Sequence, residues 1–225
     1  MGILPEKIIK LKPAVLYGVI LFCCVILITG YLTPGYSQLH HALSELGAPN
    51  APYARLVRWF GFIPLGVSFL IYADQSRRLF SNKLPIALFL LTGLAIIAVG
   101  IFPTDPHGRR DTISGIIHAI AGIFLLSVLS LTPLVLTFPG QYKTPPRSWL
   151  LVFSFVMGIL VSVFFIMLPN GISPQLIEFH KKVLGDYFVI WYPLHGLHQR
   201  LLLGIYFVWL LISSRFVDKT SAHLF

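Results

Sequence analysis

Apolar positions along this chain form six long runs separated by short polar segments. Each run is close to the ~20 residues that a helix needs to cross the hydrocarbon core of a bilayer. The runs predict membrane-spanning helices over residues 13–32, 56–73, 84–102, 113–138, 149–168 and 188–213. No repeat or linker divides the chain, so we expect one integral membrane domain over residues 1–225, with an all-α fold.

Composition supports this fold class. Hydrophobic residues make up 56% of the chain and charged residues 11%, whereas soluble domains have about 25% charged residues. The net charge of +9 could indicate nucleic-acid binding, but the basic residues are scattered and form no continuous stripe. We therefore expect membrane lipids, and not nucleic acid, as partners. The oligomeric state stays open.

The two ends of the apolar pattern need interpretation. A basic N-terminus before an apolar run is also typical of a signal peptide, but the run of about 20 residues exceeds a signal core and no cleavage site is evident. We expect a retained first span.

The last span begins with polar residues, so either its helix starts near Phe188 and carries them into the membrane, or this part is interfacial. The first reading is favoured, because Arg200 near a helix end can extend its head to the interface.

The distribution of charge predicts orientation. If both termini are cytoplasmic, more of the 17 Lys and Arg residues fall inside than outside, as the positive-inside rule requires. We therefore expect a multi-pass protein of the cell inner (cytoplasmic) membrane. The loops rich in His, Ser, Asp and Glu would then face outward, and any chemistry would lie there.

Candidate chemistry is densest between residues 100 and 122. Asp111, Ser114 and His118 are spaced by three and four, which places them on one face of a helix. His118 lies within the predicted membrane, where an ionisable residue is a functional hypothesis. It could be an acid/base or metal-ligand histidine oriented by Asp105 or Asp111. Alternatively, His118 hydrogen-bonds a neighbouring helix and Asp111 caps its own helix.

The preceding turn, FPTDPHG, holds Asp105 and His107. Its position beside the fourth span makes a functional role for Asp105 a hypothesis, although ordinary turn chemistry is the preferred interpretation, since Asp-Pro pairs are common in turns.

The first outer loop contains HHALSELGAP, with Ser44 and Glu45. A short helix here would pair His41 with Glu45 and His40 with Ser44, four residues apart. A His/Glu pair suits metal binding or proton transfer. The alternative is an interfacial helix with a solvated polar face.

The last span begins with PLHGLHQR. His195 and His198 are spaced as a metal-binding pair can be, although no HExxH or CxxC motif accompanies them. Gln199 and Arg200 follow, and Arg200 could bind a lipid phosphate or an acidic side chain.

Four of these patterns together resemble a known family. SELG (Ser44–Gly47), GIFPTD (Gly100–Asp105), His118 and GLHQR (Gly196–Arg200) are similar to domain-of-unknown-function family 998. Its members are bacterial and archaeal membrane proteins of about six helices without an established activity. The resemblance covers nearly the whole chain and implies one site made of Ser44, Glu45, Asp105, His118, Gln199 and Arg200.

Three classes of function stay open. The first is an outward-facing enzyme acting on a lipid or lipid-linked substrate, with His118 as base, Asp105 as its orienter and Arg200 as an anion clamp. The second is a non-enzymatic small transporter, lipid-binding protein or assembly partner. The third is a haem b protein using His118 with His195 or His198. The residues leave the cofactor unknown.

The first class requires a specific geometry. Asp105, His118 and Arg200 should converge in one pocket at the outer leaflet. An unpaired Arg within the bilayer costs about 2.5–3.5 kcal/mol at a helix centre, so Arg200 should meet a carboxylate, a carbonyl or a phosphate. Among the acidic residues, we expect Asp105 or Glu45 to be the partner of Arg200.

Overall fold

The structure is a computed structural model that describes residues 14–106, 111–144, 146–167 and 192–222, together with 178, 181, 182 and 185. Six of its helical segments are long and apolar enough to cross a membrane. The main helices are α1 (Ala14–Leu32), α3 (Ile63–Ser76), α4 (Leu84–Ile101), α5 (Ile113–Val135), α6 (Ser148–Met167) and α9 (His195–Ala222). The all-α prediction is confirmed, since the described residues contain no strand and only one isolated β-bridge.

The second span is continuous but locally irregular. It consists of α2 (Ala54–Leu56), the π-helix η2 (Val57–Phe62) and α3, and therefore starts and ends slightly beyond the predicted 56–73. Pro64 has no N–H to continue the helical ladder. Just before it, the Ile63 N–H donates to the carbonyl of Arg58, five residues back. The wider turn includes Arg58, which reaches the neighbouring end of α4.

The start of the last helix differs from the prediction. The α-helix begins at His195, after a 3-10 turn η4 (Tyr192–Leu194), and not at Phe188, which itself lies outside the described residues. Pro193 explains the delay, because proline disfavours the α conformation of the residue before it. The polar residues from His195 to Arg200 consequently occupy the first two turns of α9. The fourth span also ends earlier, at Val135 in place of Phe138.

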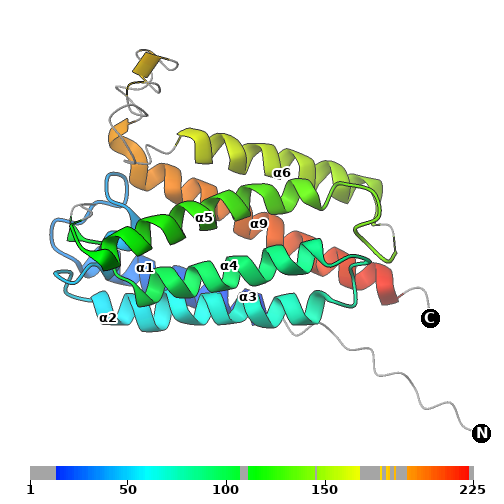
Figure 1. Ribbon diagram of the computed structural model, residues 1–225, viewed down its shortest axis with the longest axis horizontal. Coiled ribbons are helices and arrows are strands. Elements are labelled where there is room, and N and C mark those ends of the chain that lie inside the picture. Colours follow the sequence, from blue (N-terminus) through cyan, green and yellow to red (C-terminus); the bar gives the residue numbers. More distant parts are fainter. Residues whose placement is uncertain are drawn as a thin grey trace, which may run out of the picture.

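The helices run along a common direction, and the start of α1 and the end of α9 lie at the same end of the bundle (Figure 1). We call this the termini end; it carries the α3–α4 and α5–α6 loops. The opposite end carries the α1–α2 loop, the α4–α5 connection and the start of α9. Because the spans alternate in direction, the candidate segments that were predicted to face outward lie at this opposite end.

Aromatic side chains of α9 hold the bundle together. Tyr206 and Trp209 are completely buried. Tyr206 stacks on Phe69 of α3 with ring centroids 6.3 Å apart, and the Trp209 indole N–H donates to Ser154 of α6 over 2.9 Å. These contacts fix the middle of α9 relative to α3 and α6.

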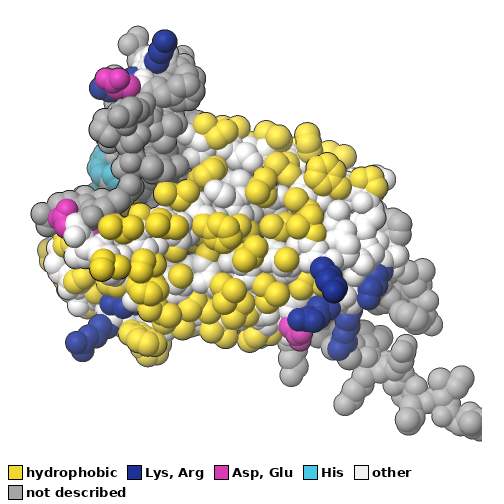
Figure 2. Space-filling model, in the orientation of Figure 1, with side chains coloured by type: hydrophobic (Ala, Val, Ile, Leu, Met, Phe, Trp, Pro, Cys, Tyr) yellow, Lys and Arg dark blue, Asp and Glu magenta, His cyan; other side chains and the backbone are white. Residues whose placement is uncertain are grey.

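Apolar side chains cover the middle of the molecular face shown in Figure 2, and Lys and Arg lie towards its ends. The helix α6 is the least enclosed of the six spans. Within its apolar stretch 22% of the residues are buried inside the protein, against 39–50% for the other spans. The length, apolar character and surface of the six helices indicate a multi-pass membrane protein.

Candidate functional site at the opposite end

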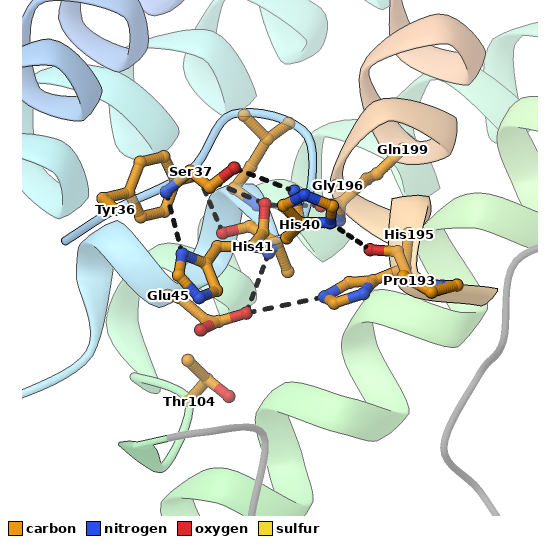
Figure 3. A network of polar contacts seen from close by, with 12 residues as sticks. Tyr36, Ser37, His40, His41, Glu45, Thr104, Pro193, His195, Gly196 and Gln199 are labelled. Carbon is orange, nitrogen blue, oxygen red and sulfur yellow. Dashed lines mark hydrogen bonds and ion pairs between the residues drawn. The ribbon is translucent and has the colours of Figure 1, made fainter. Parts of the chain in front are cut away.

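The α1–α2 loop docks onto the first turns of α9. The Leu197 N–H donates to the carbonyl of Leu39 over 3.0 Å, and Nδ1 of His40 donates to the carbonyl of Pro193 over 2.8 Å. The side-chain oxygen of Gln199 accepts the Leu43 N–H over 2.8 Å. Segments some 155 positions apart in the chain are thus joined by hydrogen bonds (Figure 3). We call this group the loop–α9 cluster: Tyr36, His40, His41, Glu45, His195, Gln199 and Arg200.

The loop is not the short α-helix that the spacing predicted. Its regular part is a 3-10 helix η1 (Leu43–Gly47), with Ser44 half-buried inside it. Nδ1 of His41 accepts the Ser37 N–H over 2.9 Å. A main-chain N–H can only donate, so a neutral His41 carries its proton on Nε2. The pairing of His40 with Ser44 is replaced by the bond from His40 to Pro193.

Glu45 and His195 form an ion pair across this interface. Oε1 of Glu45 lies 3.8 Å from Nε2 of His195 and also accepts the Ala42 N–H over 2.8 Å. The Glu45 and His195 side chains are 21% and 36% exposed. Burial raises the pKa of Glu45, but the contacts with His195, the Ala42 N–H and His41 outweigh it and lower the pKa overall. The carboxylate is therefore ionised at neutral pH, beside an imidazole that can be protonated.

Arg200 is held by main-chain carbonyls and a tyrosine. Its Nη1 donates to the carbonyls of His41 (3.1 Å) and Gly196 (2.8 Å), and its Nη2 donates to the Tyr36 hydroxyl over 2.6 Å. The expectation of a carbonyl partner is confirmed, while neither Asp105 nor Glu45 is among its hydrogen-bond partners. Carbonyl dipoles bind Nη1 of the guanidinium without the cost of desolvating a second charge.

Tyr36 completes this contact from the loop side. Its hydroxyl donates to the carbonyl of Ala42 over 3.0 Å, and the Arg200 guanidinium lies 5.7 Å from the centre of its ring. Burial raises the pKa of Tyr36, although Arg200 lowers it in part. The phenol is therefore neutral at physiological pH and can accept from Arg200 while donating to Ala42.

Gly196 makes the docking sterically possible. A Cβ at this position would overlap the main-chain carbonyl of His41 and lie 2.9 Å from its nitrogen. Only glycine lets two backbones approach so closely. The glycine of the GLHQR pattern thus has a packing role in the loop–α9 cluster.

A second group of polar residues surrounds the α4–α5 connection. Both carboxylate oxygens of the buried Asp105 bind Thr112: Oδ1 accepts its hydroxyl over 2.7 Å and Oδ2 its N–H over 2.9 Å. The Thr112 oxygen accepts the Gly115 N–H over 3.0 Å, which makes Thr112 the N-cap of α5. The alternative that Asp111 is this cap is therefore wrong; Asp111 is exposed just before it.

The carbonyls at the end of α4 are also satisfied by side chains. Arg58 donates to the carbonyls of Gly100 (2.8 Å) and Ile101 (2.7 Å). Ser114 donates to Pro103 over 3.1 Å, and Nδ1 of the buried His118 donates to Phe102 over 2.7 Å. A helix end leaves such carbonyls without intrahelical partners. We call this group the capping cluster: Arg58, Asp105, Thr112, Ser114 and His118.

The predicted site residues therefore divide between two neighbouring groups. Ser44, Glu45, Gln199 and Arg200 lie together at the loop and α9, whereas Asp105, Ser114 and His118 belong to the capping cluster. Thr104, next to Asp105 in the chain, is drawn beside Glu45 in Figure 3. The convergence of Asp105, His118 and Arg200 in one open pocket stays a prediction.

The two histidines proposed as a metal pair have different surroundings. His195 faces Glu45, while His198 is completely buried with its ring 6.2 Å from that of Phe164. Within the described part of the chain, no three His, Cys, Asp or Glu side chains gather closely enough to hold a metal ion. His107 lies outside the described residues. Metal and haem binding stay predictions.

Sequence reasoning missed four residues of the site. Arg58 is a charged residue within a predicted span, which is a recognisable signal. Thr112 precedes an apolar run in the manner of an N-cap. Tyr36 and Gly196 carry no local signal, because their roles depend on a contact between the first loop and the last helix.

The fold and these clusters define a six-span helical membrane protein with a polar site at one end. The family model described as "Protein of unknown function (DUF998)" matches residues 16–215. The chain belongs to this family, and the resemblance carried by the SELG, GIFPTD and GLHQR patterns is thereby confirmed. No curated protein and no solved structure matches the chain.

Proposed function

We propose that the loop–α9 cluster acts on the polar head of a lipid or lipid-linked substrate by acid–base chemistry. The observation that carries this proposal is the Glu45–His195 pair, with Oε1 and Nε2 3.8 Å apart and both side chains partly exposed. An imidazole beside a carboxylate is a common arrangement for general acid–base catalysis. The pair lies at the end of the bundle, next to the apolar surface of the helices, and this position suits a substrate whose acyl tail lies along the helices.

The proton transfer uses the two imidazole nitrogens differently. Nε2 of His195 faces Glu45, so Nδ1 is the nitrogen that can accept a proton from a substrate hydroxyl or from water. The deprotonated oxygen attacks the phosphorus or carbonyl carbon of an ester in the headgroup, and the bond from that atom to the leaving oxygen breaks. The Glu45 carboxylate stabilises the imidazolium in the meantime, and the imidazolium then gives its proton to the leaving oxygen. Tyr36 and Arg200 are positioning residues in this scheme, because their hydrogen bonds hold the loop against α9.

Asp105 and His118 support this chemistry indirectly in the proposal. Their hydrogen bonds join the end of α4 to the start of α5. They would fix the connection that lies beside Glu45, and would contact no substrate.

The orientation of the site follows from charge and is also proposed. Exposed cations in the two loops at the termini end are Arg77, Arg78, Lys83, Lys143 and Arg147. The positive-inside rule places this end in the cytoplasm, and hence the loop–α9 cluster on the outside of the cytoplasmic membrane. Alkaline phosphatase fused at the C-terminus should be inactive, and activity there would reverse the orientation.

The experiment for the reaction uses the purified full chain in nanodiscs made from native lipid extract. Lipids are followed by mass spectrometry over time with wild-type protein, Glu45→Gln and His195→Gln. Arg55→Gln is the matched control, since Arg55 is exposed at the same end. We expect one lipid class to be converted by wild type and the control, with at least a hundredfold slower conversion by the two variants. Conversion that is absent in wild type, or unchanged in both variants, refutes the proposal.

A non-enzymatic lipid-binding or assembly protein is the second candidate. It is favoured by Arg200, whose Nη1 and Nη2 donate to groups of the protein itself. An arginine bound in this way holds the loop in place and is not positioned to bind a substrate. This candidate predicts a lipid or a protein that co-purifies in stoichiometric amount and stays unchanged in the same nanodisc experiment. The transporter and haem alternatives have no specific contact in their favour.

A further inference from the structure

The two loops at the termini end are bound to each other. The Ser81 N–H donates to the carbonyl of Gln141 and the Lys143 N–H to that of Leu79, both over 2.9 Å. Phe80 and Tyr142 form an isolated antiparallel bridge, and their rings lie 5.3 Å apart. The α3–α4 and α5–α6 loops therefore form one rigid unit.

This unit carries exposed cations from both loops. Arg78 and Lys83 come from the α3–α4 loop, and Lys143 and Arg147 from the α5–α6 loop; all four are exposed. We call these four residues the basic platform. Figure 2 shows Lys and Arg gathered at this end of the face displayed. The neighbouring acid Asp74 pairs with Arg77 over 3.0 Å and leaves the platform itself positive.

The platform differs from two cations at the opposite end. Arg58 and Arg200 turn inward and donate to main-chain carbonyls. Within the described part of the chain, the platform side chains make no hydrogen bond or ion pair that would engage their donors. These donors are available to an anion outside the protein.

The depth of the platform identifies the kind of anion. Its residues lie between the ends of neighbouring helices, directly beyond the apolar surface that covers the middle of the bundle. Phe138 and Trp149 flank it and are 59% and 41% exposed, as aromatic residues at a membrane–water interface are. At this level a lipid phosphate is the nearest anion. A nucleic acid would instead need a basic stripe that extends into water.

We propose that the basic platform binds the headgroups of anionic phospholipids in the leaflet at the termini end. Two loops tied by hydrogen bonds present cations at fixed spacing, which reduces the entropy lost when a headgroup binds. A basic residue near an anionic membrane surface contributes about a fivefold gain in affinity. This surface is separate from the loop–α9 cluster and does not depend on its function.

The test is native mass spectrometry of the detergent-solubilised full chain, titrated with phosphatidylglycerol or with phosphatidylcholine of the same acyl chains. The variant Lys83→Gln/Lys143→Gln removes one cation from each loop, and Arg55→Gln removes an exposed cation from the opposite end. We expect tighter binding of phosphatidylglycerol by wild type, about 25-fold weaker binding by the double variant, and less than a twofold change in the control. Binding should also weaken with salt.

Three outcomes would overturn this proposal. The first is equal affinity for the two lipids, and the second is an unchanged affinity in the double variant with its helical circular dichroism intact. The third is displacement of phosphatidylglycerol by double-stranded DNA at equal phosphate concentration, which would identify a nucleic-acid surface. Because the substituted side chains are exposed, loss of folding is not expected.

Discussion

The loop–α9 cluster and the capping cluster lie at the same end of the bundle and contain the same residue types. In the capping cluster, Asp105 holds the N-cap of α5, and His118 binds a carbonyl at the end of α4. In the loop–α9 cluster, Glu45 and His195 bind each other through their side chains. The capping histidine is 8% exposed, whereas the side chain of His195 is 36% exposed.

This comparison teaches that residue type alone does not separate structural from chemical histidines. A histidine whose nitrogen satisfies a helix end stabilises the fold, and its removal leaves a buried carbonyl without a partner. A partly exposed histidine beside a carboxylate keeps a nitrogen for proton transfer. Variants in the two clusters should therefore change different properties.

The largest effect on stability is expected from Asp105→Ala. Two hydrogen bonds from Thr112, the N-cap of α5, lose their acceptor when the buried Asp105 carboxylate is removed. We expect unfolding free energy to fall by about 2–3 kcal/mol, measured by denaturation of the purified protein in detergent. The control Asp74→Ala removes only an exposed ion pair with Arg77 and should change it by about 0.5 kcal/mol or less. Equal stability of the two variants would contradict the role of the capping cluster.

The next effect is expected from Gly196→Ala. The added Cβ overlaps the His41 carbonyl, so the loop must move away from α9, at a cost of about 1–3 kcal/mol. Hydrogen exchange of the Leu43 and Leu197 amides should become faster. Gly204→Ala is the matched control on the same helix, because a Cβ there meets nothing within 4 Å. Unchanged exchange in Gly196→Ala would mean that the docking does not need the glycine.

The Glu45 contact predicts a pH dependence. Its pKa is lower in the folded protein than in the unfolded chain, so its contribution is fully present above the ordinary glutamate pKa. That contribution is lost as the pH falls through the lowered folded pKa. Exchange protection of the Leu43 amide, corrected for intrinsic rates, should therefore decrease only in acid. Glu45→Gln should remove this acid-dependent step, and a step that persists in the variant would assign it to another group.

The smallest effect is expected from Tyr36→Phe. The variant keeps the ring beside Arg200 and removes one hydroxyl that bonds to Arg200 and to Ala42. A loss of about 0.5–1.5 kcal/mol follows from the net value of such bonds. Tyr31→Phe serves as the control, since Tyr31 is 89% exposed. A loss above about 3 kcal/mol would contradict the small contribution assigned to this hydroxyl.

The six spans were predictable because hydrocarbon length and apolar composition determine them. The start of α9 was mispredicted, since Pro193 delays the helix although the apolar pattern continues through it. One alternative prediction made Asp111 the N-cap of the fourth span, because Asp and Thr are both good caps. Thr112 is the cap because Asp105 binds it, and this contact could not be predicted from the sequence. A carbonyl was among the partners expected for Arg200, but which carbonyls bind it could not be predicted, because main-chain carbonyls carry no signal in the sequence.

The most direct test of the account compares His195→Gln with His118→Gln in the nanodisc conversion assay, with rates expressed per folded molecule. The account predicts that His195→Gln abolishes conversion while stability changes by less than about 1 kcal/mol. It predicts that His118→Gln lowers stability and leaves the conversion rate per folded molecule within about threefold of wild type. Loss of conversion in His118→Gln at unchanged stability, with a normal rate in His195→Gln, would contradict the account and place the chemistry in the capping cluster.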